Sequence, residues 1–103
     1  MSDETKTLYV NVKDLSFKSE QYIDDLMQFI VEQIPHLDVN REGNELEITM
    51  PSDLSKRAIK LRIKKFLYKK DLKDDYRPIA YREDERDGYT IKERKKFEFT
   101  YYY

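Results

Sequence analysis

Residues 55–70 read SKRAIKLRIKKFLYKK, in which eight of the sixteen residues are Lys or Arg and none is Asp or Glu. The apolar residues of this stretch recur at the three- and four-residue spacing of one helical face, and they are Ile59, Ile63, Phe66 and Leu67. The stretch therefore predicts an amphipathic helix that buries one apolar stripe and spreads positive charge over its other faces.

The residues before the basic stretch predict a strand and a second helix. Residues 7–12 alternate between apolar and polar side chains, which is typical of a half-buried strand. Ser16 or Ser19 can cap the helix that follows, and Pro35 ends it because proline has no N–H for the helical ladder. Its apolar stripe is Ile23, Leu26, Met27, Ile30 and Ile34.

Alternating segments on both sides of these helices predict four more strands. Residues 36–50 predict a hairpin that alternates on both sides of its turn, where Gly43-Asn44 supplies positive φ. Residues 75–83 and 88–103 predict a second hairpin, with Asp87-Gly88 as its turn. In its last strand, one face is expected to carry Phe97, Phe99 and Tyr101.

The predicted order is β-α-β-β-α-β-β, which is the order of a two-layer α+β fold with two helices packed on one face of one sheet. A chain of 103 residues fits one domain, so residues 1–103 are expected to form a single unit, with fraying at residues 1–5 and 101–103.

Charge divides the chain into two unlike halves, although the formal net charge is only −1. Residues 1–54 contain 4 Lys or Arg and 12 Asp or Glu, a charge of −8, whereas residues 55–103 contain 16 and 9, a charge of +7. Such asymmetry is typical of proteins that bind nucleic acid or membrane surfaces. It also fits two halves that attract each other.

Composition argues against most kinds of chemistry. The chain has no Cys, which excludes disulfides and thiolate sites, and its one His, His36, lies beside Pro35 at a helix exit. No Gly-rich phosphate loop is present, and the pairs Asp24-Asp25 and Asp74-Asp75 suit solvated surfaces. We therefore expect no enzyme, cofactor, metal site or small-molecule substrate. The polar N-terminus and the lack of an apolar run of about 20 residues predict a cytoplasmic protein without membrane contact.

The far side of the basic helix favours a binding surface. Leu61 and Tyr68 lie there among cations, and no acid within the stretch offsets the repulsion between lysines four residues apart. Cations neutralise phosphates and Tyr stacks on bases, so the pattern indicates a polyanion-binding face. A solvated face with salt bridges to other elements is the alternative.

The same region resembles the eukaryotic-type large-subunit ribosomal protein twenty-two family. The family pattern is met without gaps by Ser55-Lys56-Arg57, Lys60, Lys64-Lys65-Phe66-Leu67, Lys69, Leu72 and Arg77. The segment LEITMP at 46–51 looks like the family's strand before this helix, and residues 7–12 and 25–34 match more loosely. The chain carries no Lys-rich N-terminal extension and no acidic C-terminal tail, as a tail-less, archaeal-like member would.

This resemblance implies a non-enzymatic protein that binds folded RNA, with large-subunit ribosomal RNA and neighbouring ribosomal proteins as its expected partners. The predicted RNA-binding residues are Lys56, Arg57, Lys60, Lys64, Lys65, Tyr68, Lys69, Lys70 and Arg77. The acidic segment 20–47 is expected to face away from RNA. The alternative is a protein–protein interaction module that uses the acidic helix (20–34) and the basic helix (55–70), and that could self-associate.

Overall fold

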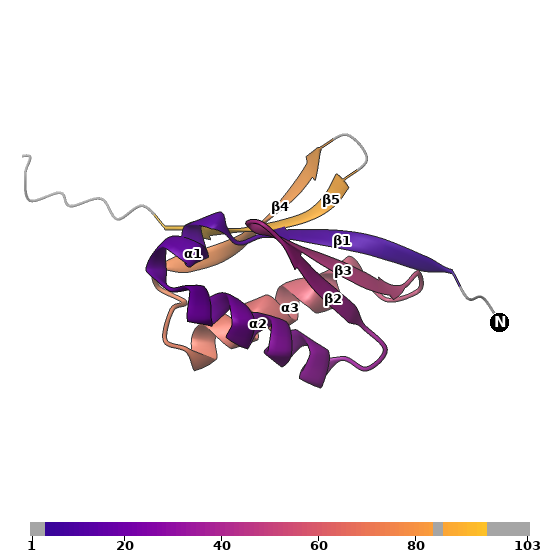
Figure 1. Cartoon of the computed structure of the whole chain (residues 1–103), viewed down its shortest axis with the longest axis horizontal. Helices are drawn as coiled ribbons and strands as arrows, with labels where there is room; N and C mark the ends of the chain where they lie inside the picture. Colours follow the sequence, from indigo (N-terminus) through magenta and orange to yellow (C-terminus); the bar gives the residue numbers. More distant parts are fainter. Residues whose placement is uncertain (1–3, 84–85, 95–103) are drawn as a thin grey trace, which may run out of the picture.

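The computed structural model describes residues 4–83 and 86–94, and it has an α+β fold in which helices cover one face of a mixed five-stranded sheet (Figure 1). The elements in chain order are β1 (Thr5–Asn11), α1 (Lys13–Lys18), α2 (Glu20–Gln33), β2 (Asp38–Glu42), β3 (Glu45–Pro51), α3 (Lys56–Lys69), β4 (Tyr76–Glu83) and β5 (Arg86–Glu93). The predicted fold class is confirmed, with the short helix α1 as an addition.

The sheet has the strand order β2-β3-β1-β5-β4, so the two hairpins flank the N-terminal strand. Strand β1 pairs antiparallel with β3 and parallel with β5, and it therefore joins the two halves of the sheet. The parallel register sets Tyr9, Val10 and Asn11 beside Gly88, Tyr89 and Thr90.

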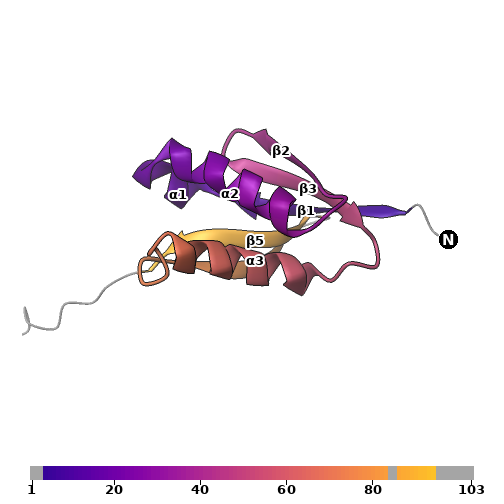
Figure 2. The same ribbon diagram turned by 90° about the horizontal axis from the view of Figure 1, so that it is seen from below.

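Helices α2 and α3 lie side by side on one face of the sheet, as the two views together show (Figure 2). They touch through Phe29 and Phe66, whose ring centroids are 5.8 Å apart. Alternate residues of the strands are buried beneath the helices, and these include Leu8, Val10, Leu46, Ile48, Met50, Tyr76, Tyr89 and Ile91. The predicted α3 stripe is fully buried, and in α2 only Met27 of the predicted stripe is partly exposed.

The connection between β1 and α2 holds α1, which the sequence pattern did not predict. The Asn11 side chain accepts a hydrogen bond from the Lys13 backbone N–H at 3.0 Å, and Leu15 of α1 is buried. Ser19 then caps α2, because its Oγ accepts from the Gln21 backbone N–H at 3.2 Å. Of the two predicted caps, Ser19 is therefore the one that begins the long helix.

The predicted ends of α2 and of the first hairpin agree with the structure. Helix α2 ends at Gln33, two residues before Pro35. Strands β2 and β3 pair around a two-residue turn, in which Gly43 has a φ of 63°. Asn44 does not share this positive φ, so Gly43 alone provides the left-handed backbone that the turn requires.

The predicted turn at Asp87-Gly88 is wrong. The register pairs Arg82 with Asp87 and Tyr81 with Gly88, so both residues lie within β5. Gly88 is required there because a Cβ atom would lie 1.7 Å from the Tyr9 carbonyl oxygen. The glycine thus serves a close approach of two backbones and not a turn. The predicted face formed by Phe97, Phe99 and Tyr101 lies outside the described residues.

Candidate nucleic-acid interface

Helix α3 begins at a capped N-terminus and is basic from its first turn. The Ser55 hydroxyl accepts a hydrogen bond from the Arg57 backbone N–H at 3.1 Å, which satisfies one of the free donors of the helix end. No acid lies in the first turn of α3, although acids stabilise that end of a helix. The burial of its apolar stripe therefore provides most of what holds α3 on the sheet.

The C-terminus of α3 is closed by a Schellman motif. Asp71 has a φ of 59°, its N–H donates to the Tyr68 carbonyl at 3.1 Å, and the Leu72 N–H donates to the Leu67 carbonyl at 2.7 Å. Leu72 is buried, as is typical of this motif. The tight reversal brings the next residues and the start of β4 alongside the end of α3.

Lys56, at the start of α3, is held within the protein. Its ammonium forms an ion pair with Asp87 on β5 and lies 4.9 Å from the centroid of the Tyr89 ring. The hydrogen bond from Lys56 keeps the pKa of the Asp87 carboxyl below its usual value, against the effect of burial. Burial raises the pKa of the Tyr89 phenol, whose hydroxyl donates to the Lys56 carbonyl at 3.3 Å. These contacts dock the start of α3 on the sheet.

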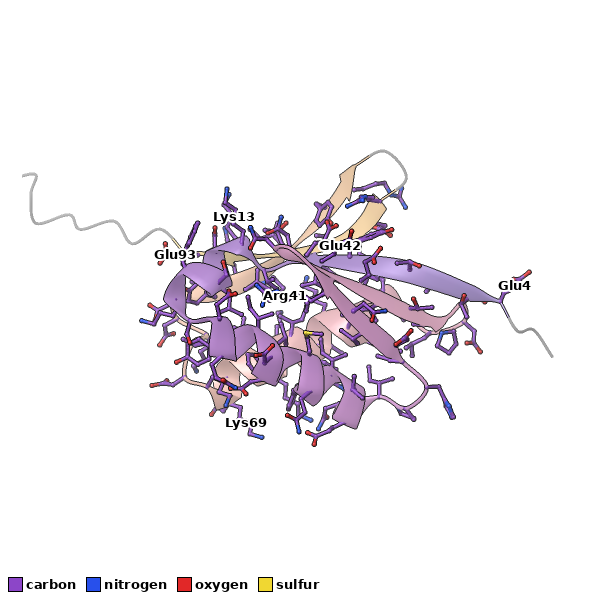
Figure 3. The ribbon with its side chains drawn as sticks, viewed as in Figure 1. Glu4, Lys13, Arg41, Glu42, Lys69 and Glu93 are labelled. Carbon is purple, nitrogen blue, oxygen red and sulfur yellow. The ribbon has the colours of Figure 1, made fainter. Side chains whose placement is uncertain are left out.

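The two lysines at the end of α3, which are its last residue Lys69 and its C-cap Lys70, turn toward α2. Lys70 lies 3.3 Å from the Asp25 carboxylate, and the Lys69 ammonium lies 5.5 Å from the centroid of the Phe29 ring. A hydrogen bond from Gln21 and the nearby Lys70 lower the pKa of Asp25, and burial acts in the opposite direction. Figure 3 shows Lys69 at the edge of the helical layer, pointing away from the sheet. Lys70 is thus compensated by an acid that lies outside the basic stretch.

Apart from Arg62, whose Nε is buried without a hydrogen-bond partner among the described residues, the remaining cations of α3 face solvent or a groove along the edge strand β4. Lys64 and Lys65 are exposed, and neither forms an ion pair with a carboxylate in the described part of the chain. Leu61 and Tyr68 are 47% and 68% exposed, as the helical pattern predicts. The outer surface of α3 therefore combines uncompensated positive charge with apolar and aromatic groups.

The groove between α3, the turn after it and β4 has a volume of about 700 Å³. We call it the α3–β4 groove, and it is lined by Lys60, Lys64, Leu67, Tyr68, Lys73, Asp74, Tyr76, Arg77, Pro78 and Arg94. Five of these residues are cations and one is an acid. Burial raises the pKa of the Tyr76 phenol, with Glu93 adding to the effect, so this phenol stays neutral and adds no negative charge. The groove is a concave, positively charged surface.

Four of the predicted binding residues meet in this groove, and these are Lys60, Lys64, Tyr68 and Arg77. The exposed Arg57 and Lys65 lie elsewhere on α3, and Lys56, Lys69 and Lys70 make the internal contacts described above. The cations of this helix therefore fall into two groups. Those at its two ends contact other elements of the protein, and others, such as Lys64 and Lys65, form no ion pair with an acid of the described residues.

Lys73 and Arg94 belong to the groove although the sequence analysis did not select them. The Arg94 N–H donates to the Asp75 carbonyl at 2.7 Å, and its Nε donates to the Lys73 carbonyl at 3.1 Å. Lys73 places its ammonium 4.7 Å from the centroid of the Tyr68 ring. Proximity of Lys73 to the end of α3 was visible in the sequence, whereas Arg94 reaches the groove only through the pairing of β4 with β5.

Acidic residues are concentrated on strands β2 and β3, in the half of the sheet that lies away from β4. Asp38, Glu42, Glu45 and Glu47 occupy these strands, and Arg41 forms an ion pair with Glu20 at 2.9 Å. Glu45 in turn pairs with Arg86. Strand β2 is one edge of the sheet and β4 is the other, so the acidic hairpin and the α3–β4 groove lie at opposite edges.

Comparisons with known proteins identify no relative, because no protein-family model and no curated protein matches the chain. The part of the chain that the structure describes contains no group of three or more His, Asp or Glu residues arranged to hold a metal ion. Within the same residues, no helix has the length and apolar character needed to cross a membrane.

Proposed function

We propose that this protein binds folded RNA through the exposed part of α3 and the α3–β4 groove, as a non-enzymatic domain similar to the large-subunit ribosomal protein twenty-two family. The observation that carries the proposal is the groove, whose lining combines five cations, the exposed Tyr68 and a single acid. Cations placed in this way neutralise phosphates, and the release of counterions then drives binding.

The charge distribution supports one orientation of docking. The groove lies along one edge of the sheet and the acids of β2 lie at the other edge, so an RNA that enters the groove meets five cations and one acid. Paired RNA hides its base edges in a deep, narrow major groove, so a helix that binds phosphates reads mainly the shape of the duplex. Large-subunit ribosomal RNA in the cytoplasm is the partner that the sequence resemblance favours.

The test compares two double variants that change the net charge equally. Lys64→Glu with Lys65→Glu reverses two uncompensated cations of α3, whereas Lys13→Glu with Lys18→Glu reverses two exposed cations of α1. Affinity for a labelled RNA hairpin is measured over a salt series by fluorescence anisotropy. The α3 variant is expected to bind more weakly, and its salt slope is expected to be lower by about 0.7–0.9 for each phosphate that it no longer neutralises.

The α1 variant is expected to keep most of the affinity, because Lys13 and Lys18 lie outside the α3–β4 groove. An equal loss of affinity in both variants would mean that only net charge matters, and unchanged affinity in the α3 variant would remove the proposed site. An unstructured RNA of the same length is the second control. A preference for that strand over the hairpin would contradict recognition of folded RNA.

Self-association through the acidic α2 and the basic α3 remains the alternative prediction. Asp25 of α2 and Lys70 of α3 already pair within one molecule, which reduces what these two residues can offer a second copy. Sedimentation of the RNA-free protein over a range of concentrations tests this alternative. A concentration-dependent dimer that the Lys64→Glu, Lys65→Glu variant abolishes would favour it.

A further inference from the structure

The interior of the α3–β4 groove differs from a surface that only follows a phosphate backbone. Its lining includes Leu67, Tyr76 and Pro78, whose side chains are almost wholly covered, and the exposed ring of Tyr68, which is the apolar surface that a ligand would meet. Phosphate oxygens gain nothing from apolar surface, whereas the flat face of a base does. The groove volume of about 700 Å³ also lies within the range of sites that enclose small ligands.

Tyr68 is placed as a stacking platform at this groove. The side chain is 68% exposed, so it contributes little to the core. The Lys73 ammonium lies 4.7 Å from its ring centroid, a distance that favours a cation–π contact and keeps the ring beside the groove. An exposed ring flanked by cations is the arrangement with which proteins hold unpaired bases.

Asp74 is the one acid in the lining, and it does not suit phosphate binding. Its charge repels phosphate, yet it lies among five cations and forms no ion pair with another residue of the described chain. Carboxylates accept hydrogen bonds from the amino groups of bases. Asp74 is exposed, so solvent alone can satisfy it, and a ligand that carries both a phosphate and a donor on a base edge would suit the cations and this acid together.

We propose that the α3–β4 groove holds one unpaired nucleotide that projects from the RNA duplex. Its base stacks on Tyr68, its donor edge faces Asp74, and its flanking phosphates lie against Lys60, Lys64 and Arg77. This inference rests on the proposed RNA-binding function and adds a specificity to it: the protein prefers a duplex that is interrupted by a bulged nucleotide.

The test uses two RNA hairpins that are identical except for one bulged adenosine in the stem. The wild-type protein is expected to bind the bulged hairpin about 5- to 150-fold more tightly, which is the range that one stacked base contributes. Tyr68→Ala is expected to abolish this preference by weakening binding of the bulged hairpin alone. Tyr68→Phe keeps the ring and is expected to keep the preference, and melting curves show that both variants fold.

Asp74→Ala is an independent test, because it is expected to change the affinity for the paired hairpin and the preference for the bulged hairpin in opposite directions. Loss of the acid is expected to strengthen binding of the fully paired hairpin, because phosphate repulsion is removed, and to weaken the preference for the bulge. Equal affinity of the wild type for both hairpins, or an equal effect of Tyr68→Ala on both, would overturn the inference and leave the proposed function standing. Failure of the wild type to bind either hairpin would overturn the proposed function itself.

Discussion

Replacement of Gly88 by Ala is the most direct test of the strand pairing that joins the two halves of the sheet. An added Cβ would lie 1.7 Å from the Tyr9 carbonyl oxygen, 2.7 Å from its carbonyl carbon and 3.0 Å from its nitrogen. Carbon and oxygen normally approach to about 3.3 Å. The two backbones would therefore have to separate by about 1.5 Å at the first of the three residue pairs of the parallel pairing.

The expected cost has two parts. Forced overpacking in a tight site costs about 1–3 kcal/mol. Separation of β1 from β5 also weakens a ladder that pairs only three residues on each strand, where a backbone hydrogen bond contributes about 1 kcal/mol. Gly88→Ala should therefore lower the free energy of unfolding by at least about 2 kcal/mol, and the melting temperature by about 8 °C or more.

Gly43 is the matched control, because the chain contains only these two glycines. A Cβ at Gly43 meets no atom within 4 Å, and Ala there suffers only the strain of a φ of 63°, about 1 kcal/mol. Urea denaturation and thermal melting of Gly88→Ala, Gly43→Ala and the wild type give the comparison. A Gly88→Ala protein as stable as Gly43→Ala would refute the close approach of β1 and β5. That result would fit Gly88 in an open turn.

Three further changes test other parts of the structure. Asp71→Gly should stabilise the protein by about 0.5–1 kcal/mol in urea denaturation, because Gly adopts the left-handed backbone at the end of α3 without strain. Phe66→Ala should lower the free energy of unfolding by about 3–5 kcal/mol, whereas Tyr68→Ala on the exposed face should change it by less than about 0.5 kcal/mol. The pKa of Asp87 is lowered in the folded protein, so its ion pair with Lys56 contributes its full stability above the usual carboxyl pKa. This stability is lost as the pH falls through the lower pKa of the folded state. Acid unfolding curves should therefore show a smaller loss of stability in Lys56→Met than in the wild type.

The two long helices, α2 and α3, could be predicted because their signals are local. The stripe from Ile59 to Leu67 spans nine residues, and burial of all four members follows from helical spacing alone. The role of Gly88 could not be predicted in this way. An Asp-Gly pair suits a hairpin turn, and only the pairing of β5 with Tyr9, far away in the sequence, reveals that this glycine admits a neighbouring backbone.

In the candidate site, too, contacts between elements that are distant in the sequence could not be predicted. The sequence correctly placed Tyr68 and Leu61 on the exposed side of α3, yet it could not divide the lysines of that helix by role. Lys56 is compensated from β5 and Lys70 from α2, and such partners depend on how the elements pack. Arg94 enters the groove for a similar reason, since its backbone bonds to Asp75 across the second hairpin.

The ion pairs between α3 and other elements help to explain how so basic a helix is stable. Lysines four residues apart repel one another by about 0.2–0.5 kcal/mol per pair. At the two ends of α3, Asp87 and Asp25 offset the charge of Lys56 and Lys70 and also fix the helix to β5 and α2. The ends of the helix are therefore relieved of repulsion by acids that other elements supply.

The middle of α3 has no such relief, because Lys60 and Lys64 share the α3–β4 groove with three other cations and a single acid. The repulsion that remains is therefore concentrated where the helix borders the groove, and a bound phosphate would remove it. A helix that needed only to cover the sheet would gain stability from Glu at these central positions. The cost of omitting such acids is small beside the burial of the apolar stripe, and the groove keeps a net positive charge.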